Sequence, residues 1–351
     1  MPAATDVVSW PEGRTPFVRS EAVRQWTGVA DLRIKHEGMN PTGSFKDRGM
    51  TAAVTHAVHT GARAIACAST GNTAASLAAY AAIAGLPALV LVPEGKVATG
   101  KLAQATAYGA TVLLVDGDFD SCLELVRAAS RELGVYLANS VNPWRIEGQK
   151  TIAWELLGQT GWDSPPDWIA LPAGALGNTG ALGKALREAH ALGALPRVPR
   201  ILSVQAAGAA PFAQGFEHGF AERVRVHAET VASAIRIGDP ASWERGVRAI
   251  HETNGAVAAV SDDEILDAKA VIDAAGIGCE PASAASVAGV RALRSRGVIA
   301  ADATVACILT GHLLKDPDTT IAYHGGSGAR ANPPVRISAD LREIRRLVPS
   351  A

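Results

Sequence analysis

From residue 61 onward, short runs of hydrophobic and β-branched residues alternate with longer alanine-rich stretches, and glycines separate them. Short apolar runs bounded by turn residues predict strands, and longer runs with helical spacing predict helices. We predict strands over 62–69, 87–93, 111–116 and 135–139, and helices over 73–85, about 99–108 and 119–133. Because repeated strand–helix units form parallel sheets with right-handed crossovers, this half of the chain predicts a parallel sheet.

The same alternation resumes in the second half of the chain. We predict strands over 167–174, 200–208, 256–261 and 304–311, with helices near 147–158, after Gly177, over 262–275 and over 281–296. The length of 351 residues exceeds the usual domain size of roughly 100–200 residues. We therefore expect an α/β protein with two lobes, each a mostly parallel twisted sheet flanked by helices. The Gly/Pro-rich segment HGGSGARANPP predicts a loop or a loose tail.

Charge and cysteine content argue against several classes of protein. The 33 basic and 34 acidic residues give a formal net charge of −1, so no large basic surface is available to attract a nucleic acid. The four cysteines lie far apart and outside CxxC pairs, which argues against a disulfide framework or a metal site. The N-terminus has no basic segment followed by an apolar one, and no apolar run reaches about 18 residues. We expect a soluble, cytoplasmic protein without a membrane partner.

A lysine follows a turn at the start of an expected helix. In NPTGSFKDRGM, which begins at residue 40, the first four residues predict a turn, and Ser44 can cap a helix that carries Lys46. The positive end of the helix dipole and the neighbouring Arg48 would both favour the neutral amine of Lys46. A neutral amine is what a Schiff base requires. The alternative is a solvated lysine on a capped helix.

Two further segments lead from a strand directly into a helix and could bind anions. They are CASTGNTAAS, residues 67–76, and LPAGALGNTGAL, residues 171–182. Free backbone N–H groups at a helix start attract phosphate or carboxylate, and glycine lets the backbone approach closely. The second segment lacks the GxGxxG order and the lysine of a P-loop, so it predicts no nucleotide site. For the first segment, a plain helix cap is the alternative.

Polar side chains also follow two other expected strands. In NSVNPWRIEGQKT, Arg145 could offer forked donors to a phosphate, with Asn139 and Ser140 as neutral donors. The alternative is an arginine that packs on Trp144 or pairs with Glu147. In ILTGHLLKDP, the hydroxyl of Thr310 against a pyridine nitrogen would leave that nitrogen largely unprotonated. His312 and Lys315 of the same segment can be turn residues.

Together these segments resemble the fold type II pyridoxal-phosphate enzymes, also called the tryptophan synthase β family. The family's motifs occur in order: SFKDRGM around Lys46, ASTGNTAAS around Asn72, the loop ending GALGN, NSVNPWRIEGQKT, CEPASAAS around Glu280, and LTGHLLKDP. The resemblance runs from residue 14 to about residue 324. It implies a homodimer with pyridoxal 5′-phosphate in a cleft between two domains. We expect a large domain of residues 1–52 and 147–351, a small mobile domain of residues 53–146, and a loose tail from about 325.

The resemblance also implies a role for each motif residue. Lys46 would hold the cofactor covalently and act in catalysis, Asn72 would contact its 3′ oxygen, and Thr310 would face its ring nitrogen. The cofactor phosphate would be held by the loop of Gly174, Ala175, Leu176, Gly177 and Asn178. The substrate would be gripped by Ser69, Thr70 and Thr73, and its phosphate by Asn139, Ser140 and Arg145. Many relatives carry a donor side chain where this chain has Ala175, and histidine is common in place of Trp144.

Three features favour one branch of the family: SFKDRGM, the asparagine in the phosphate loop, and TGHxLKD. That branch converts O-phospho-L-homoserine and water to L-threonine and phosphate. Serine and threonine dehydratases typically carry an all-glycine phosphate loop, and cysteine synthases a GTGGT loop. Two alternatives stay open at this point. One is a serine or threonine ammonia-lyase, and the other is a catalytically silent ligand-binding protein that keeps the fold.

Overall fold

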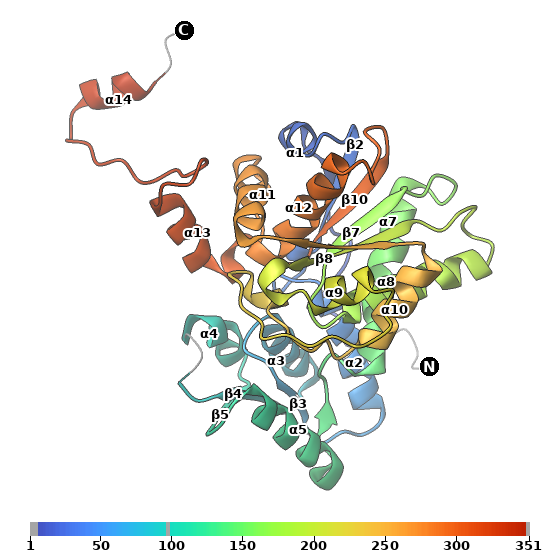
Figure 1. Ribbon diagram of the computed structural model, residues 1–351. Helices are drawn as coiled ribbons and strands as arrows, with labels where there is room; N and C mark the ends of the chain where they lie inside the picture. The colour runs from blue at the N-terminus through green and yellow to red at the C-terminus, as the bar shows by residue number, and fades with distance from the viewer. Residues whose placement is uncertain (1–5, 96–98, 349–351) are drawn as a thin grey trace.

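A computed structural model describes residues 6–95 and 99–348, and its strands form two sheets (Figure 1). The larger sheet has six strands in the order β1-β2-β10-β7-β8-β9, and the smaller has four in the order β5-β4-β3-β6. All neighbours pair in parallel except β1 and β2. The expected α/β class with two parallel sheets is confirmed.

The four-stranded sheet follows the predicted alternation closely. Its strands are β3 (Ile65–Ala68), β4 (Ala88–Pro93), β5 (Thr111–Val115) and β6 (Tyr136–Leu137). Its helices are α3 (Asn72–Ala84), α4 (Thr99–Ala107) and α5 (Phe119–Leu133). Helices α3 and α5 end at Gly85 and Gly134, whose φ angles of 65° and 67° lie in the left-handed region that glycine adopts without strain. The side chains of α3 and α4 share a hydrophobic core on one face, and those of α5 pack on the other.

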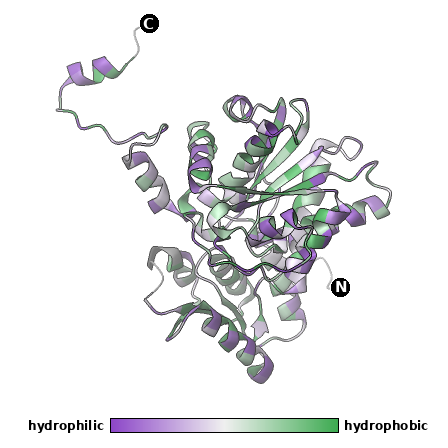
Figure 2. Ribbon diagram, in the orientation of Figure 1, coloured by the Kyte–Doolittle hydropathy of each residue, from purple (hydrophilic) through white to green (hydrophobic). Residues whose placement is uncertain are grey.

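The six-stranded sheet carries the predicted strands of the second half. They are β7 (Trp168–Pro172), β8 (Arg200–Ala206), β9 (Ala256–Val260) and β10 (Thr304–Leu309). One face packs against α1 (Glu21–Thr27), α11 (Asp262–Ala274) and α12 (Pro281–Ser295). The other packs against α7 (Thr151–Thr160), α8 (Gly177–Ala191), α9 (Pro211–Glu217) and α10 (Trp243–Glu252). Covered on both faces, these strands are largely hydrophobic, as Figure 2 shows.

The edge of this sheet comes from the N-terminus, for which the hydrophobic pattern predicted no element. Strands β1 (Phe17–Arg19) and β2 (Asp31–His36) flank α1 and pair antiparallel. The C-terminal strand β10 inserts between β2 and β7, and pairs with β2 from Thr304 against Asp31 to Leu309 against His36. The end of β2 and the end of β10 therefore lie side by side.

The helix that begins at Lys46 packs against a helix from the other end of the small sheet. This helix, α2 (Lys46–His59), contacts α6 (Pro143–Gln149). A Cβ placed on Gly148 would lie 1.8 Å from the carbonyl oxygen of Arg48, so only glycine permits this approach. The single helix expected near 147–158 is wrong in its start: Asn142 caps α6 with Pro143 in the first turn, and α7 follows after Lys150.

The chain leaves the two sheets after β10. Helix α13 (Pro317–Gly325) is followed by an extended segment and by α14 (Leu341–Leu347), which projects away from the body in Figure 1. Residues 349–351 of the expected tail lie outside the described residues. Within residues 6–95 and 99–348, no helix is long and apolar enough to cross a membrane.

Candidate active site

Lys46 lies at the first turn of α2, beside the end of β10. The backbone N–H of Phe45 donates to the carbonyl oxygen of Thr310 at 2.9 Å, and Ser44 forms a bridge with Gly311. The hydroxyl of Ser44 accepts from the N–H of Lys46 at 3.4 Å, although the helix cap itself is Phe45. The lysine predicted to hold the cofactor is thus joined through the backbone to the threonine predicted to face its ring.

The surrounding protein favours the neutral amine of Lys46. Its pKa falls from 10.5 to about 7, chiefly because burial disfavours the ammonium ion. The positive charge of Arg145 lowers the pKa further, and the carboxylate of Glu280 opposes the shift. The expectation that Arg48 supplies the repelling charge is wrong, because the charge that acts on Lys46 is that of Arg145. At neutral pH a substantial fraction of Lys46 is a free amine.

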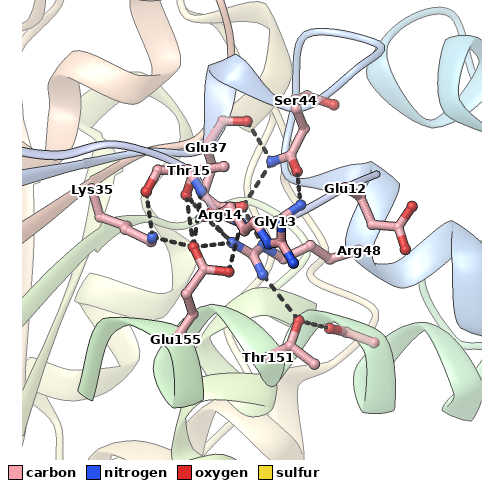
Figure 3. A network of polar contacts seen from close by, with 12 residues as sticks. Glu12, Gly13, Arg14, Thr15, Lys35, Glu37, Ser44, Arg48, Thr151 and Glu155 are labelled. Atoms are coloured by element: carbon pink, nitrogen blue, oxygen red, sulfur yellow. Dashed lines mark hydrogen bonds and ion pairs between the residues drawn. The ribbon is translucent and has the colours of Figure 1, made fainter. Parts of the chain in front are cut away.

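Arg48 points into a buried polar network (Figure 3). Its guanidinium donates to both carboxylate oxygens of Glu37, at 2.6 and 2.8 Å, and lies 3.0 Å from Glu155. Lys35 completes the network by donating to Glu155 at 2.5 Å and to the carbonyl oxygen of Thr15 at 2.8 Å. The network therefore ties α2 to the end of β2, to α7 and to the N-terminal segment, and Arg48 has a structural role.

The start of α3 presents the segment expected to bind substrate. Ser69, Thr70 and Thr73 are half-buried between the end of β3 and the first turn of the helix. The hydroxyl of Ser69 accepts from the N–H of Gly71 at 3.3 Å, so this turn is ordered by its own side chain. Asn72 reaches across to the large sheet, where its side-chain N–H donates to Glu280 at 2.9 Å. The alternative interpretation of this segment as a plain helix cap is wrong, because the N-cap residue of α3 is Gly71 and no side chain caps the helix.

Arg145 reaches the same place from α6. It is buried, and its guanidinium donates to the carbonyl oxygen of Ala138 at 3.0 Å and to the hydroxyl of Thr73 at 3.5 Å. Burial lowers its pKa from 12.5 to about 10, so it stays charged at neutral pH. Its Nε has no hydrogen-bond partner. A buried cation with a free donor requires an anionic partner.

The two alternatives for Arg145, packing on Trp144 and pairing with Glu147, are wrong. Trp144 stacks on His56 instead, with ring centroids 4.3 Å apart, and Glu147 pairs with Lys150 at 2.7 Å. Of the two neutral donors, Asn139 already exchanges hydrogen bonds with the backbone of Ala68, at 3.0 and 3.1 Å. Asn139 therefore holds the end of β3, whereas Ser140 is half-buried beside the start of α8.

The loop from β7 into α8 forms a cradle at the N-terminus of a 15-residue helix. Leu176 adopts φ 63°, an uncommon angle for a residue with a side chain, and turns the backbone into the helix. A Cβ on Gly174 would lie 3.2 Å from the backbone of Ile235, so the loop packs tightly against the segment that contains Ile235. Asn178 is buried, yet neither its amide nitrogen nor its amide oxygen has a partner, and the hydroxyl of Ser242 has none either.

These features fit the phosphate of pyridoxal phosphate. A long helix presents unpaired N–H groups and a positive dipole end, and the unsatisfied donors of Asn178 and Ser242 require an acceptor. Ala175 can offer only backbone groups, because its methyl side chain carries no donor. Its carbonyl oxygen accepts from the N–H of Ser242. Ser242 was not predicted as a site residue, because it belongs to a loop 64 positions further along the chain than Asn178.

The end of β10 supplies the remaining polar groups. Thr310 is buried, and its hydroxyl lies 3.0 Å from that of Ser283 and 3.3 Å from a carboxylate oxygen of Glu280. His312 is a turn residue that caps a short 3-10 helix, as expected. Lys315 has contacts beyond those of a turn residue, because it is half-buried, donates to Gln104, and faces the carboxylates of Glu280 and Asp47. Glu280 and Lys315 were not predicted to carry a role.

Comparison with known proteins identifies the family of the chain. A family model described as pyridoxal-phosphate dependent enzyme matches residues 8–311. The threonine synthase of Methanosarcina acetivorans is 49% identical over 350 residues, which cover 99% of this chain and 84% of that protein. The threonine synthase of Mycobacterium bovis is 50% identical over 312 residues, covering 88% and 84%.

Solved structures share the fold at lower identity. The processed form of threonine deaminase isoform 2 from Solanum lycopersicum is 21% identical, with a TM-score of 0.74 over 88% of each chain. Diaminopropionate ammonia lyase from Escherichia coli is 17% identical, with a TM-score of 0.76 over 93% of this chain and 91% of that one. The chain belongs to the pyridoxal-phosphate-dependent enzymes of fold type II. Within them, it belongs to the threonine synthases.

Proposed function

We propose that this protein converts O-phospho-L-homoserine and water to L-threonine and phosphate. The observation that carries the proposal is the pair of interior cations Lys46 and Arg145, whose charges interact. One has a pKa of about 7 and can act as an amine base, whereas the other has a pKa of about 10 and keeps its charge. This is the combination that a reaction needs when it moves protons and expels a phosphate. The threonine synthases named above are 49% and 50% identical to the chain.

The chain's own residues would hold the cofactor at four places. Lys46 would hold it covalently, and Asn72 and Thr310 would contact the ring oxygen and the ring nitrogen. Its phosphate would lie at the loop of Gly174, Ala175, Leu176, Gly177 and Asn178, where the unpartnered atoms of Asn178 and the N-terminus of α8 are free to bind it. When bound, pyridoxal phosphate supplies an electron sink that makes protons on the substrate's α and β carbons acidic.

Lys46 is the base that the proposed reaction uses. As a free amine it would take the α proton of the substrate, give that proton up again, and then take a proton from the β carbon, because both carbons lie within reach of one flexible side chain. Protonated, it would return the β proton to the γ carbon after the phosphate leaves. Water then supplies the hydroxyl at the β carbon and its remaining proton to the released phosphate, and the α carbon regains its proton to give threonine. The low pKa of Lys46 matches this alternation between base and acid at neutral pH.

Arg145 would hold the phosphate that leaves. Its free Nε and its contact with Thr73 place a permanent positive charge at the start of α3, where Ser69 and Thr70 would bind the substrate carboxylate. A fixed charge aimed at the leaving group stabilises the negative charge that develops there. Ser140 would add a neutral donor. Asn139 contributes by holding the end of β3, where Ser69 begins the turn.

Phosphate release from O-phosphohomoserine, with analysis of the organic product, tests the proposal. The expected products are equal amounts of phosphate and threonine, and Lys46→Ala should form neither. Release of ammonia from threonine, without turnover of phosphohomoserine, would instead identify an ammonia-lyase. The family comparison does not favour that alternative, since the ammonia-lyase and deaminase structures reported above are at most 21% identical to this chain.

The proposal includes a cytoplasmic homodimer. All four cysteines of the chain are buried and free, as is usual in a reducing compartment, where disulfides are rare. The dimer follows from the family resemblance. Light scattering on the purified protein should give a mass of about twice the 36.2 kDa of the chain, and a mass equal to one chain would contradict the dimer.

A further inference from the structure

Glu280 occupies a position that no part of the proposed function uses. It is the N-cap residue of α12, and its side chain is buried. The backbone N–H of Glu280 donates to the carbonyl oxygen of Gly311 at 3.1 Å, which fixes the residue beside the end of β10. A buried carboxylate is unfavourable unless hydrogen bonds and nearby cations compensate for the lost water.

The carboxylate of Glu280 joins two side chains that come from different sheets. One oxygen accepts from the amide N–H of Asn72, at the start of α3, at 2.9 Å. The other accepts from the hydroxyl of Thr310, at the end of β10, at 3.3 Å. These are the two residues proposed to contact the ring of the cofactor, one at its 3′ oxygen and one at its nitrogen.

The space for this carboxylate depends on a glycine. A Cβ on Gly311 would lie 2.3 Å from the carboxyl carbon of Glu280 and 2.5 Å from each of its oxygens, which is closer than atoms can approach. The TGH sequence after β10 therefore leaves room for Glu280. Ser283, one turn into α12, supports the same arrangement by accepting from the N–H of Gly311 at 2.9 Å and contacting the hydroxyl of Thr310 at 3.0 Å.

The charges around Glu280 come from two elements. Burial raises the pKa of the Glu280 carboxyl above its usual value, and the hydrogen bond from Asn72 and the positive charges of Lys315 after β10 and Lys46 on α2 oppose that rise. Cys279 is its buried neighbour in the chain, and the thiol stays protonated because burial raises its pKa. An ionised carboxylate accepts hydrogen bonds and cannot donate them. The geometry is that of an acceptor, because one carboxylate oxygen lies 2.9 Å from the amide nitrogen of Asn72 and the other lies 3.3 Å from the hydroxyl of Thr310.

We propose that Glu280 is a positioning residue that orients both Asn72 and Thr310 toward the cofactor ring. With one amide hydrogen of Asn72 bound to Glu280, the second is left for the ring oxygen. With its hydrogen directed to Glu280, Thr310 presents lone pairs to the ring nitrogen. The inference rests on the proposed cofactor contacts of Asn72 and Thr310. It adds that one carboxylate sets both contacts, across the two sheets.

The test compares cofactor binding by Glu280→Gln, Glu280→Asp and the unchanged protein, each first freed of cofactor. Titration with pyridoxal phosphate, followed by its visible absorbance, gives the dissociation constant, and a pH series gives the protonation of the bound cofactor. Loss of one charge-assisted hydrogen bond predicts about ten- to a hundredfold weaker binding in Glu280→Gln. The pH dependence of the absorbance should also shift. Glu264→Gln, a change in the exposed capping box of α11, is the matched control and should change neither.

A double-mutant cycle separates positioning from a general structural effect. If Glu280 acts through Asn72, then Glu280→Gln should weaken cofactor binding far less in an Asn72→Ala background than in the unchanged protein. The same full weakening in both backgrounds would overturn the proposal, as would unchanged binding and unchanged spectra in Glu280→Gln. If the glutamine variant does not fold, Glu280→Asp carries the same comparison, because its shorter side chain withdraws the carboxylate from Asn72. Failure of the unchanged protein to bind the cofactor would contradict the proposed function instead.

Discussion

Arg48 binds Glu37 through two parallel hydrogen bonds, from Nε to one carboxylate oxygen at 2.6 Å and from Nη2 to the other at 2.8 Å. Both side chains are buried. Because Arg48 follows Lys46 by two residues, this pair anchors the first turn of α2 to the end of β2. The lysine proposed to act in catalysis is thus held on a helix whose first turn is fixed by a buried ion pair.

Breaking this pair should destabilise the protein. Removing one partner of a buried ion pair costs about 3–5 kcal/mol, since the other charge is left without compensation. We expect Glu37→Gln to lower the free energy of unfolding by that order, measured by urea denaturation. Arg187→Ala removes an exposed ion pair with Glu252 and should cost less than about 1 kcal/mol. Equal effects of the two changes would contradict the structural role of the network.

Cofactor uptake should depend on pH through Lys46. Only the neutral amine reacts with an aldehyde, and the lowered pKa of about 7 means that this form is lost as the pH falls below about 7. The uptake rate of cofactor-free protein should rise about tenfold between pH 6 and pH 8 and then level off. Stopped-flow absorbance measures it. A rate that still climbs steadily toward pH 10 would show an ordinary lysine.

The same pH series on a variant of Arg145 tests what lowers the pKa of Lys46. Arg145 lowers the pKa of Lys46 by charge repulsion. Arg145→Met should therefore move the midpoint of the pH profile upward. A midpoint that stays in place would mean that burial alone sets the pKa of Lys46.

Arg145 should also determine affinity for the phosphorylated substrate. Loss of a charge-assisted hydrogen bond to phosphate costs about 1.5–3 kcal/mol, so kcat/KM for phosphohomoserine should fall by about ten- to a hundredfold in Arg145→Lys. Lysine keeps the charge and loses the forked geometry. Cofactor affinity, measured separately, should change little. A parallel loss of cofactor affinity would place Arg145 in the cofactor site.

The close approach of α2 and α6 should be sensitive to one methyl group. Gly148→Ala places a Cβ 1.8 Å from the carbonyl oxygen of Arg48, so the helices that carry Lys46 and Arg145 must separate. We expect a loss of about 1–3 kcal/mol in unfolding free energy and a lower kcat/KM. Gly158→Ala in α7 meets only an indole nitrogen at 4.0 Å and should stabilise by up to about 1 kcal/mol. Unchanged stability in Gly148→Ala would show that the helices can shift freely.

Elements in the alternating part of the chain could be predicted because their signals are local. Gly85 and Gly134 end the helices α3 and α5 where expected, and strands β3 to β10 lie within the predicted runs. The N-terminal strand β2 was missed because its residues, DLRIKH, include three charged side chains. Lys35 among them is buried only because Glu155 and Thr15 compensate, and both are remote in sequence.

In the candidate site, too, local signals could be predicted and contacts between remote residues could not. Lys46, Arg145 and Thr310 were predicted from motifs that each occupy a few consecutive residues. The charge that acts on Lys46 was misjudged because Arg48 is close in sequence, whereas Arg145 is close in space. Ser242 and Glu280 were not predicted to have a role because their partners, Ala175 and Asn72, are 67 and 208 positions away in the chain.

The central position of β10 has a consequence for biosynthesis. The four-stranded sheet is formed by one continuous stretch, from Ile65 to Leu137, and can assemble as soon as that stretch leaves the ribosome. In the six-stranded sheet, β2 has no parallel neighbour until β10 is made, more than 260 residues later. During synthesis the nascent chain therefore exposes the β10-facing edge of β2, and later that of β7 as well, until β10 is made. Strand β10 fills that gap, and it brings Thr310 to the candidate site only when most of the chain has been synthesised.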